Sequence, residues 1–206
     1  MEPVNMIKDL EAAFRKNNIK CYFANDKQEA LELVSKLVKD TDLIGLGGSI
    51  TLEEIGAVEF LKKKGNTVLE WGNEKDPARK SMILRDTLNC DVFLTGTNAV
   101  TLDGKLYNVD GRGNRVAAMA YGSKKVIVVC GKNKIVRNLI EAKERLETIA
   151  APLNVKRLNK NTGCAATGYC VDCHTPERIC AVTAITEYQQ DPERMHVIII
   201  DKELGF

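Results

Sequence analysis

The sequence predicts an α/β fold in which a twisted, mainly parallel sheet lies between helices. Short apolar runs alternate along the chain with segments whose apolar residues recur at helical spacing. Apolar strands of this kind are typical of a parallel sheet that helices cover on both faces. The 206 residues suffice for one such domain but not for a second, so we expect a single domain over residues 1–206.

This alternation predicts the elements of the first half of the chain. A helix over residues 5–18, with Leu10 and Phe14 on its apolar face, precedes the strand "IKCYFA", and a second helix covers residues 26–39. The run "DLIGLGG" predicts a strand that ends in a glycine-rich turn. Thr51 and Glu54 have capping-box spacing, which places the start of the next helix at Thr51 and its end near residue 64.

The second half contains a hairpin as well as further alternating elements. "NTVLEW" predicts a strand, and a helix near residues 75–89 leads to the strand "DVFLTG". In "NAVTLDGKLYNVDG", Asp103-Gly104 lies between two β-like runs and indicates a hairpin. The helix "VAAMAYG" and the strands "KVIVVC" and "HVIIID" complete the fold.

Charge and hydropathy exclude several classes of protein. The 30 basic and 28 acidic residues are spread along the chain, and the net charge of +2 gives no footprint for nucleic acid or an anionic membrane. The segment "MEPVNMIKDLEAAFRKNN" lacks the apolar core of a signal peptide, and "HVIII" is too short to span a bilayer. We therefore expect a cytoplasmic protein with no nucleic-acid partner and no membrane insertion. The oligomeric state stays open, a homo-oligomer included.

The turn "GLGGSITLEE" is the first candidate ligand site. Glycines let the backbone approach a ligand closely, and the free N–H groups of the following helix suit a phosphate or carboxylate. The pattern is neither a dinucleotide fingerprint nor a Walker loop, so a tight turn without a ligand remains the alternative. The candidate ligand residues of this turn are Gly45, Gly47, Gly48 and Ser49.

A polar loop after the strand "DVFL" is the second candidate. Such strand ends lie at the edge where open α/β sheets place their ligands. A carboxylate and guanidinium groups there suit a small anionic ligand, and the candidate residues are Thr97, Asn98, Asp110, Arg112, Asn114 and Arg115. The alternative is an Asp-Gly turn followed by a helix cap at Asn114. We expect the residue 45–49 turn and the residue 108–115 loop to line one pocket at one edge of the sheet.

The seven cysteines fall into two groups. Cys21, Cys90 and Cys130 lie in apolar segments and are expected in the core. Four others crowd the segment "GCAATGYCVDCHTPERIC" with the spacing C-x5-C-x2-C-x6-C, namely Cys164, Cys170, Cys173 and Cys180. The two-residue gap of the central pair occurs in both zinc sites and iron–sulfur clusters. Unliganded thiols, or a disulfide formed on purification, are the alternatives.

The two histidines of the chain are assigned different roles. His174 directly follows a cysteine of the crowded segment, so it is a candidate metal ligand or a donor to one. His196 starts the strand "HVIII" and is expected to be structural.

Four stretches together make the sequence familiar: "GLGGSITLEEIG", "DVFLTGTNAVTLDGKLYNVDGRGNRVAAMAYG", "KVIVVCGKNKIV" and "CAATGYCVDCHTPERIC". The chain resembles the LUD-domain family over nearly its whole length, and within it the lactate-utilisation proteins of the LutC/YkgG type. The resemblance implies a fold like that of the NagB/RpiA/CoA-transferase group, with the Cys-rich segment of residues 163–181 inside the single domain. It also implies a role in bacterial oxidation of L-lactate to pyruvate, with other lactate-utilisation subunits as partners in an iron–sulfur complex.

Three functions follow as hypotheses. The first is an accessory or redox subunit of L-lactate oxidation, with an iron–sulfur cluster on the four cysteines and zinc as the alternative metal. The second is a stand-alone enzyme or binding protein for a phosphorylated or CoA-linked small molecule. The third is a non-catalytic module with a structural zinc. No catalytic residue is assigned, since the glutamate of the transferases has no counterpart and Asp110 matches the isomerases only by its Asp-Gly context.

Overall fold

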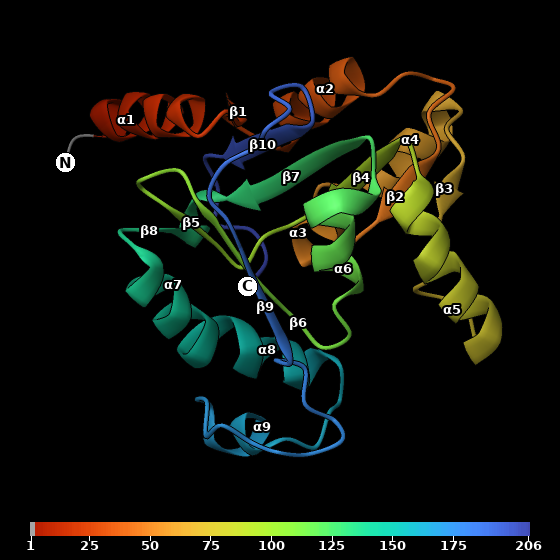
Figure 1. Cartoon of the computed structure of the whole chain (residues 1–206), viewed down its shortest axis with the longest axis vertical. Coiled ribbons are helices and arrows are strands. Elements are labelled where there is room, and N and C mark those ends of the chain that lie inside the picture. The colour runs from red at the N-terminus through yellow and green to blue at the C-terminus, as the bar shows by residue number, and fades with distance from the viewer. Residues whose placement is uncertain (1–2) are drawn as a thin grey trace.

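A six-stranded sheet, parallel throughout, forms the centre of the computed structural model, which describes residues 3–206 and the side chains from residue 7 onward (Figure 1). Its strand order is β1-β10-β7-β4-β2-β3. The strands are β1 (Lys20–Ala24), β10 (Met195–Ile200), β7 (Lys125–Gly131), β4 (Val92–Thr95), β2 (Ile44–Leu46) and β3 (Val68–Leu69). The predicted fold class, a mainly parallel sheet between helices, is confirmed.

Helices cover both faces of this sheet, and each face has its own apolar core. In β10, whose residues are all buried, Ile199 packs in one cluster with Phe14 of α1 (Pro3–Lys16). On the opposite face of the sheet, Ile198 packs in a second cluster with Val34 of α2 (Lys27–Leu37). Successive side chains of a strand point to opposite faces, so a continuous apolar run serves both cores.

The predicted hairpin is confirmed and belongs to a second, four-stranded sheet of order β8-β5-β6-β9. β5 (Ala99–Thr101) and β6 (Leu106–Asp110) are antiparallel. β8 (Ile135–Val136) and β9 (Val182–Thr186) complete the sheet. The helical segment α7 (Leu139–Arg145), η4 (Leu146–Ala150) and α8 (Ala151–Arg157) packs against it, and α9 (Gly163–Thr167) lies beyond α8 (Figure 1).

The structure corrects two expected elements. The helix predicted from Thr51 to about residue 64 is split into α3 (Ile50–Glu54) and α4 (Ala57–Lys64), because Gly56 adopts a left-handed φ of 71° between them. Its first turn is capped by the hydroxyl of Ser49, which accepts a bond from the Leu52 N–H, so the helix begins one residue earlier than the capping-box pattern indicated. The strand "NTVLEW" is reduced to the two residues of β3.

The remaining elements connect strands, some within the main sheet and some between the two sheets. They are α5 (Pro77–Asp86), η1 (Thr87–Asn89), α6 (Asn114–Ala117), the π-helix η2 (Ala118–Gly122) and η3 (Lys132–Lys134). Gly113 occupies the cap position of α6 and Asn114 is its first helical residue, so the helix cap at Asn114, given as the alternative for the polar loop, does not form. Across residues 3–206, none of the helices is both long and apolar enough to cross a bilayer.

Candidate functional site

A pocket of about 470 Å³ lies at the carboxyl edge of the main sheet. Segments that follow three neighbouring parallel strands line it: Gly48–Ile50 after β2, Gly96–Asn98 after β4 and Lys134 after β7. Open α/β sheets place their ligands at this edge. We call it the basic pocket, for the charges described below.

The structure brings most of the predicted ligand residues together in this pocket. Those that line it are Gly48, Ser49, Thr97, Asn98, Asp110, Arg112, Asn114 and Arg115. The glycine-rich turn and the polar loop therefore meet at one edge, as expected from their positions after strands. Their role in binding a ligand stays a prediction.

Gly45 and Gly47 serve packing rather than the pocket. A Cβ at Gly45 would lie 2.7 Å from the sulfur of Cys90, and a Cβ at Gly47 would lie 2.3 Å from the Thr95 hydroxyl. Both distances are shorter than atoms can approach, so these positions need glycine because side chains of β4 and of the segment before it leave no room. The sequence pattern could not separate this reason from close approach of a ligand.

Arg115 uses its guanidinium inside the protein. Its Nε donates to Asp110 at 2.8 Å, and the side chains of this pair are 12% and 8% exposed. Its two terminal nitrogens donate to the side-chain oxygens of Asn108 at 2.8 Å and Asn98 at 2.9 Å, and also to the carbonyls of Val109 and Gly96. Because a guanidinium has five N–H donors, this set engages it fully. Arg115 therefore holds the pocket wall together.

The pocket carries a strong excess of positive charge. Among the lining residues that the structure describes, Asp110 is the single acidic one, and it is paired with Arg115. The basic residues are Lys80, Arg112, Arg115, Lys134, Arg157 and Lys160. Lys160 has a partner in Glu177 at 3.3 Å. Such a balance favours a ligand with one or more anionic groups.

Lys134 is a site residue that the sequence analysis missed. Its side chain is only 4% exposed, and its Nζ donates to the Thr51 hydroxyl at 3.2 Å. Burial lowers the pKa of Lys134 to about 8, and the charges of Arg145 and Arg115 act in the same direction. The one signal in the sequence is its place in "GKNK", directly after the strand "KVIVVC".

Trp71 also escaped the sequence analysis and forms a wall of the basic pocket. Its indole N–H donates to the Leu46 carbonyl at 2.8 Å, and the ammonium of Lys80 lies 5.3 Å from the ring centre. A Cβ at Gly48 would meet the ring at 3.3 Å. The indole is thus fixed beside the glycine-rich turn.

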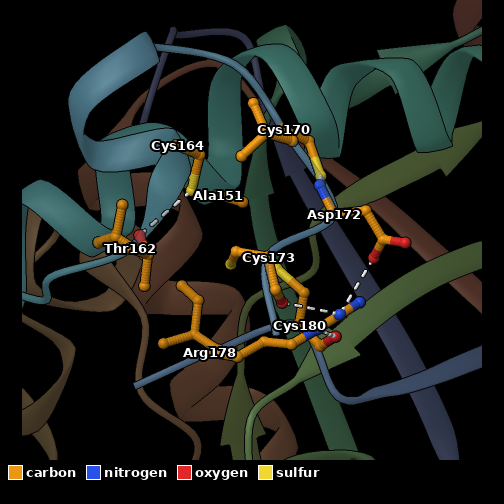
Figure 2. A pocket seen from close by; sticks show the side chains of 11 residues that line it. Ala151, Thr162, Cys164, Cys170, Asp172, Cys173, Arg178 and Cys180 are labelled. Carbon is orange, nitrogen blue, oxygen red and sulfur yellow. Dashed lines mark hydrogen bonds and ion pairs between the residues drawn. The ribbon is translucent and has the colours of Figure 1, made fainter. Parts of the chain in front are cut away.

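The four clustered cysteines line a second, small cavity of about 20 Å³, which we call the cysteine cavity (Figure 2). Cys164 is buried on α9, and its sulfur lies 3.4 Å from the Thr162 hydroxyl. Cys170, Cys173 and Cys180 come from the irregular segment between α9 and β9 and are partly exposed. All seven cysteines of the chain are free thiols. The structure therefore places all four predicted metal ligands around one cavity.

Local hydrogen bonds fix the loop of residues 170–180, which carries Cys170, Cys173 and Cys180. Asp172 adopts a left-handed φ of 46°, and its N–H donates to the sulfur of Cys170 at 3.4 Å. Arg178 donates to the carbonyls of Cys173 at 2.9 Å and Cys180 at 2.8 Å, and its guanidinium pairs with Asp172 at 3.0 Å. These bonds tie both ends of the loop to one side chain, as Figure 2 shows.

The neighbouring thiols affect the pKa of Cys180 electrostatically. Burial, together with the neighbouring Cys164, Cys170 and Cys173, raises the pKa of the Cys180 thiol to about 11, while Arg178 opposes the shift. No three Cys, His, Asp or Glu side chains are already arranged as a metal site within residues 3–206. The four thiols are of the donor type that zinc and iron–sulfur centres use and line one small cavity, and their role as metal ligands stays a prediction.

Neither histidine belongs to these cavities. His174 is exposed and lies 3.9 Å from the carboxylate of Asp172, which lines the cysteine cavity, but His174 itself is not one of the lining residues. His196 is buried, stacks on Tyr22 with ring centres 5.9 Å apart, and bonds to the Tyr22 hydroxyl and the Glu193 carbonyl. The structural role expected of His196 is confirmed by these contacts. Of the other cysteines, Cys90 and Cys130 are buried in the core and Cys21 is half-buried.

The two cavities share a wall. Ala151, Ile179 and Cys180 line both the basic pocket and the cysteine cavity. The pairing of Val182 with Asp110 places β9, and the Cys-rich segment before it, beside the polar loop. A centre on the four thiols would therefore adjoin a ligand in the basic pocket.

Comparison with known proteins gives a family and a fold. The family model of the LUD domain matches residues 7–200. A DUF162 family protein from Deinococcus radiodurans is similar over 97% of this chain and 99% of its own, at 13% identity and a TM-score of 0.53. No curated protein shows significant similarity to the sequence.

Two solved isomerases are similar over part of the chain. Ribose 5-phosphate isomerase A from Neisseria gonorrhoeae covers 56% of this chain with 57% of its own, at 18% identity and a TM-score of 0.35. Ribose 5-phosphate isomerase from Plasmodium falciparum covers 54% with 52%, at 20% identity and a TM-score of 0.35.

Proposed function

Because this chain belongs to the LUD-domain family, we propose that it is an accessory or redox component in the oxidation of L-lactate to pyruvate. The observation that carries the proposal is the cavity lined by four cysteines, which shares a wall with the basic pocket. Lactate and pyruvate are both carboxylates, so an excess of Lys and Arg side chains suits either molecule. The link to lactate itself rests on the resemblance of the sequence to lactate-utilisation proteins.

The four cysteines are the residues that would hold an iron–sulfur cluster, with zinc as the alternative. When bound, a cluster supplies one-electron transfer. Around it, Arg178 holds the loop by its bonds to the Cys173 and Cys180 carbonyls, and the Asp172 N–H donates to a ligand sulfur. Hydrogen bonds to cysteine sulfurs are one of the means by which proteins set a cluster's potential.

In the basic pocket, the chain's own residues would bind and orient the anion. Arg115 fixes Asn98, just before β5, relative to Asn108 of β6. Arg112, Arg157 and Lys134 supply positive charge to the ligand, and the Trp71 ring covers one side of the pocket. Oxidation of lactate to pyruvate releases two electrons and two protons, so electrons must leave toward other subunits, which we propose as the partners.

The metal content of protein purified without air tests the proposal. We expect iron and acid-labile sulfide in the wild-type protein and the loss of both in Cys170→Ser, because the variant removes one thiolate ligand. Cys21→Ser is the matched control: it is half-buried on β1, away from the cysteine cavity, and keeps the iron. One zinc per chain and no iron would reject the redox role and leave a structural metal module. Absence of any metal from every preparation would reject the centre.

A second candidate function is a stand-alone enzyme or binding protein for a phosphorylated or CoA-linked small molecule. The observation that favours it is the combination of basic side chains with the fixed Trp71 ring, which suits a ligand that has both phosphates and a planar group. A thermal-shift screen distinguishes the candidates, because a ligand that binds the native state raises the melting temperature. A rise with ribose 5-phosphate or acetyl-CoA, and none with lactate or pyruvate, would favour the second function.

A further inference from the structure

We propose that Lys134 is the buried cation of an anion seat in the basic pocket, and that the carboxylate or phosphate group of a ligand is its missing counter-ion. This inference rests on the proposed function in one respect, since it takes the basic pocket as the ligand site. It adds the residue that forms an ion pair with the anionic group of the ligand. It also adds a measurable consequence, which is that the protein takes up a proton when the ligand binds.

The first argument is that Lys134 is buried without a carboxylate partner. Its side chain is 4% exposed, and its one hydrogen bond goes to the Thr51 hydroxyl at 3.2 Å. Among the acidic groups of residues 3–206, none forms an ion pair with its ammonium. Removal of a charge from water is costly unless a counter-charge and hydrogen bonds replace the solvent. An ammonium has three N–H donors, so two remain for a ligand.

The second argument is that the groups facing Lys134 increase its need for an anion. Arg145 is also buried, and its guanidinium donates to the carbonyls of Asn98 and Asn133 rather than to a carboxylate. Arg115 is neutralised by Asp110. The other titratable groups near Lys134 are the Cys130 thiol and Glu54, whose carboxylate accepts a bond from the Gly205 N–H. The local balance is positive, which favours an incoming anion.

The third argument is that the ammonium is held in place. The Thr51 hydroxyl accepts from Lys134 and donates to the Leu204 carbonyl at 3.3 Å. A Cβ at Gly205 would lie 2.6 Å from that hydroxyl and 3.1 Å from the Lys134 nitrogen, so the backbone passes tightly over the pair. A fixed donor loses little conformational entropy when a ligand arrives.

Binding of an anion beside Lys134 is coupled to protonation of its amine. Since the pKa of Lys134 is lowered to about 8, a fraction of the empty protein at pH 8.5 has a neutral amine. A bound anion stabilises the ammonium and raises its pKa, so binding at that pH takes up a proton. The affinity for the anion should fall as the pH rises above this range, because the empty protein must first be protonated.

Isothermal titration calorimetry of the full chain with sodium pyruvate tests the inference. Titrations at pH 8.5 in two buffers of different ionisation enthalpy give the number of protons taken up. We expect net proton uptake by the wild-type protein and weaker binding at pH 9.5 than at pH 7.5. In Lys134→Met the affinity should fall by about tenfold or more, as for a lost charge-assisted bond, and the proton uptake should vanish. Lys132→Met, an exposed neighbour in η3 that pairs with Asp201, should keep both.

Two results overturn the inference. One is anion binding by the wild-type protein without proton uptake, a measurement that needs no variant and so does not depend on how Lys134→Met folds. The other is the finding that neither pyruvate nor inorganic phosphate binds to the protein. Binding of phosphate but not pyruvate keeps the seat and removes support for the lactate role. The iron content of Lys134→Met tests the cluster separately, because Lys134 does not line the cysteine cavity.

Discussion

Arg115 and Arg112 show how two arginines of one loop can have opposite roles. Arg115 is largely buried and gives all its donors to the protein, while Arg112 is exposed at the pocket. The sequence predicts that both arginines bind a ligand, because they lie in one polar loop. What separates them is the long-range contact of Arg115 with Asn98, 17 positions earlier, which loop composition does not reveal.

This difference predicts opposite effects of alanine. Arg115→Ala leaves the carboxylate of Asp110 buried without its partner, so we expect a loss of about 3–5 kcal/mol in the free energy of unfolding. Arg112→Ala should change stability by about 0.5 kcal/mol or less but weaken the binding of anions. Urea denaturation, paired with pyruvate or phosphate titration, measures both quantities. Similar stability losses in the two variants would contradict this assignment.

At the scale of elements, the central sheet could be predicted because its strands are short apolar runs in regular alternation. β9 could not be predicted, because Val182 and Ile185 are exposed and the strand exists by pairing with β6. The capping-box pattern predicts the cap at Thr51, but Ser49 caps the helix and the Thr51 hydroxyl donates to the Leu204 carbonyl. These contacts join residues far apart in the chain, which local patterns do not register.

The close approach of the adjacent ends of β2 and β4 is the basis of an element-scale prediction. A Cβ at Gly47 would lie 2.3 Å from the Thr95 hydroxyl and 3.2 Å from the Arg115 Cδ. Gly47→Ala should therefore force the strand ends apart and destabilise the protein by about 1–3 kcal/mol. Gly72→Ala is the control, since no heavy atom lies within 4 Å of its Cβ position. Equal melting temperatures of the two variants would show that the packing between these strand ends is looser than the structure indicates.

At the scale of the whole molecule, the second sheet joins the two candidate sites. It connects the polar loop after β6 to the Cys-rich segment before β9, so that Ala151, Ile179 and Cys180 face both cavities. The sequence could predict that the cysteines gather, because their spacing is local, and that two loops meet at one sheet edge. It could not predict the shared wall or the burial of Lys134, because both depend on packing between distant segments.

The visible absorption spectrum of anaerobically purified protein, recorded during reduction with dithionite, tests most directly whether the four cysteines hold a redox centre. A brown protein whose absorption bleaches as it takes up electrons, and whose colour is absent from Cys170→Ser but present in Cys21→Ser, is the result that we predict. A protein that is colourless and takes up no electrons in every anaerobic preparation, with Cys170→Ser indistinguishable from the wild type, would contradict the redox role of the cysteine cavity.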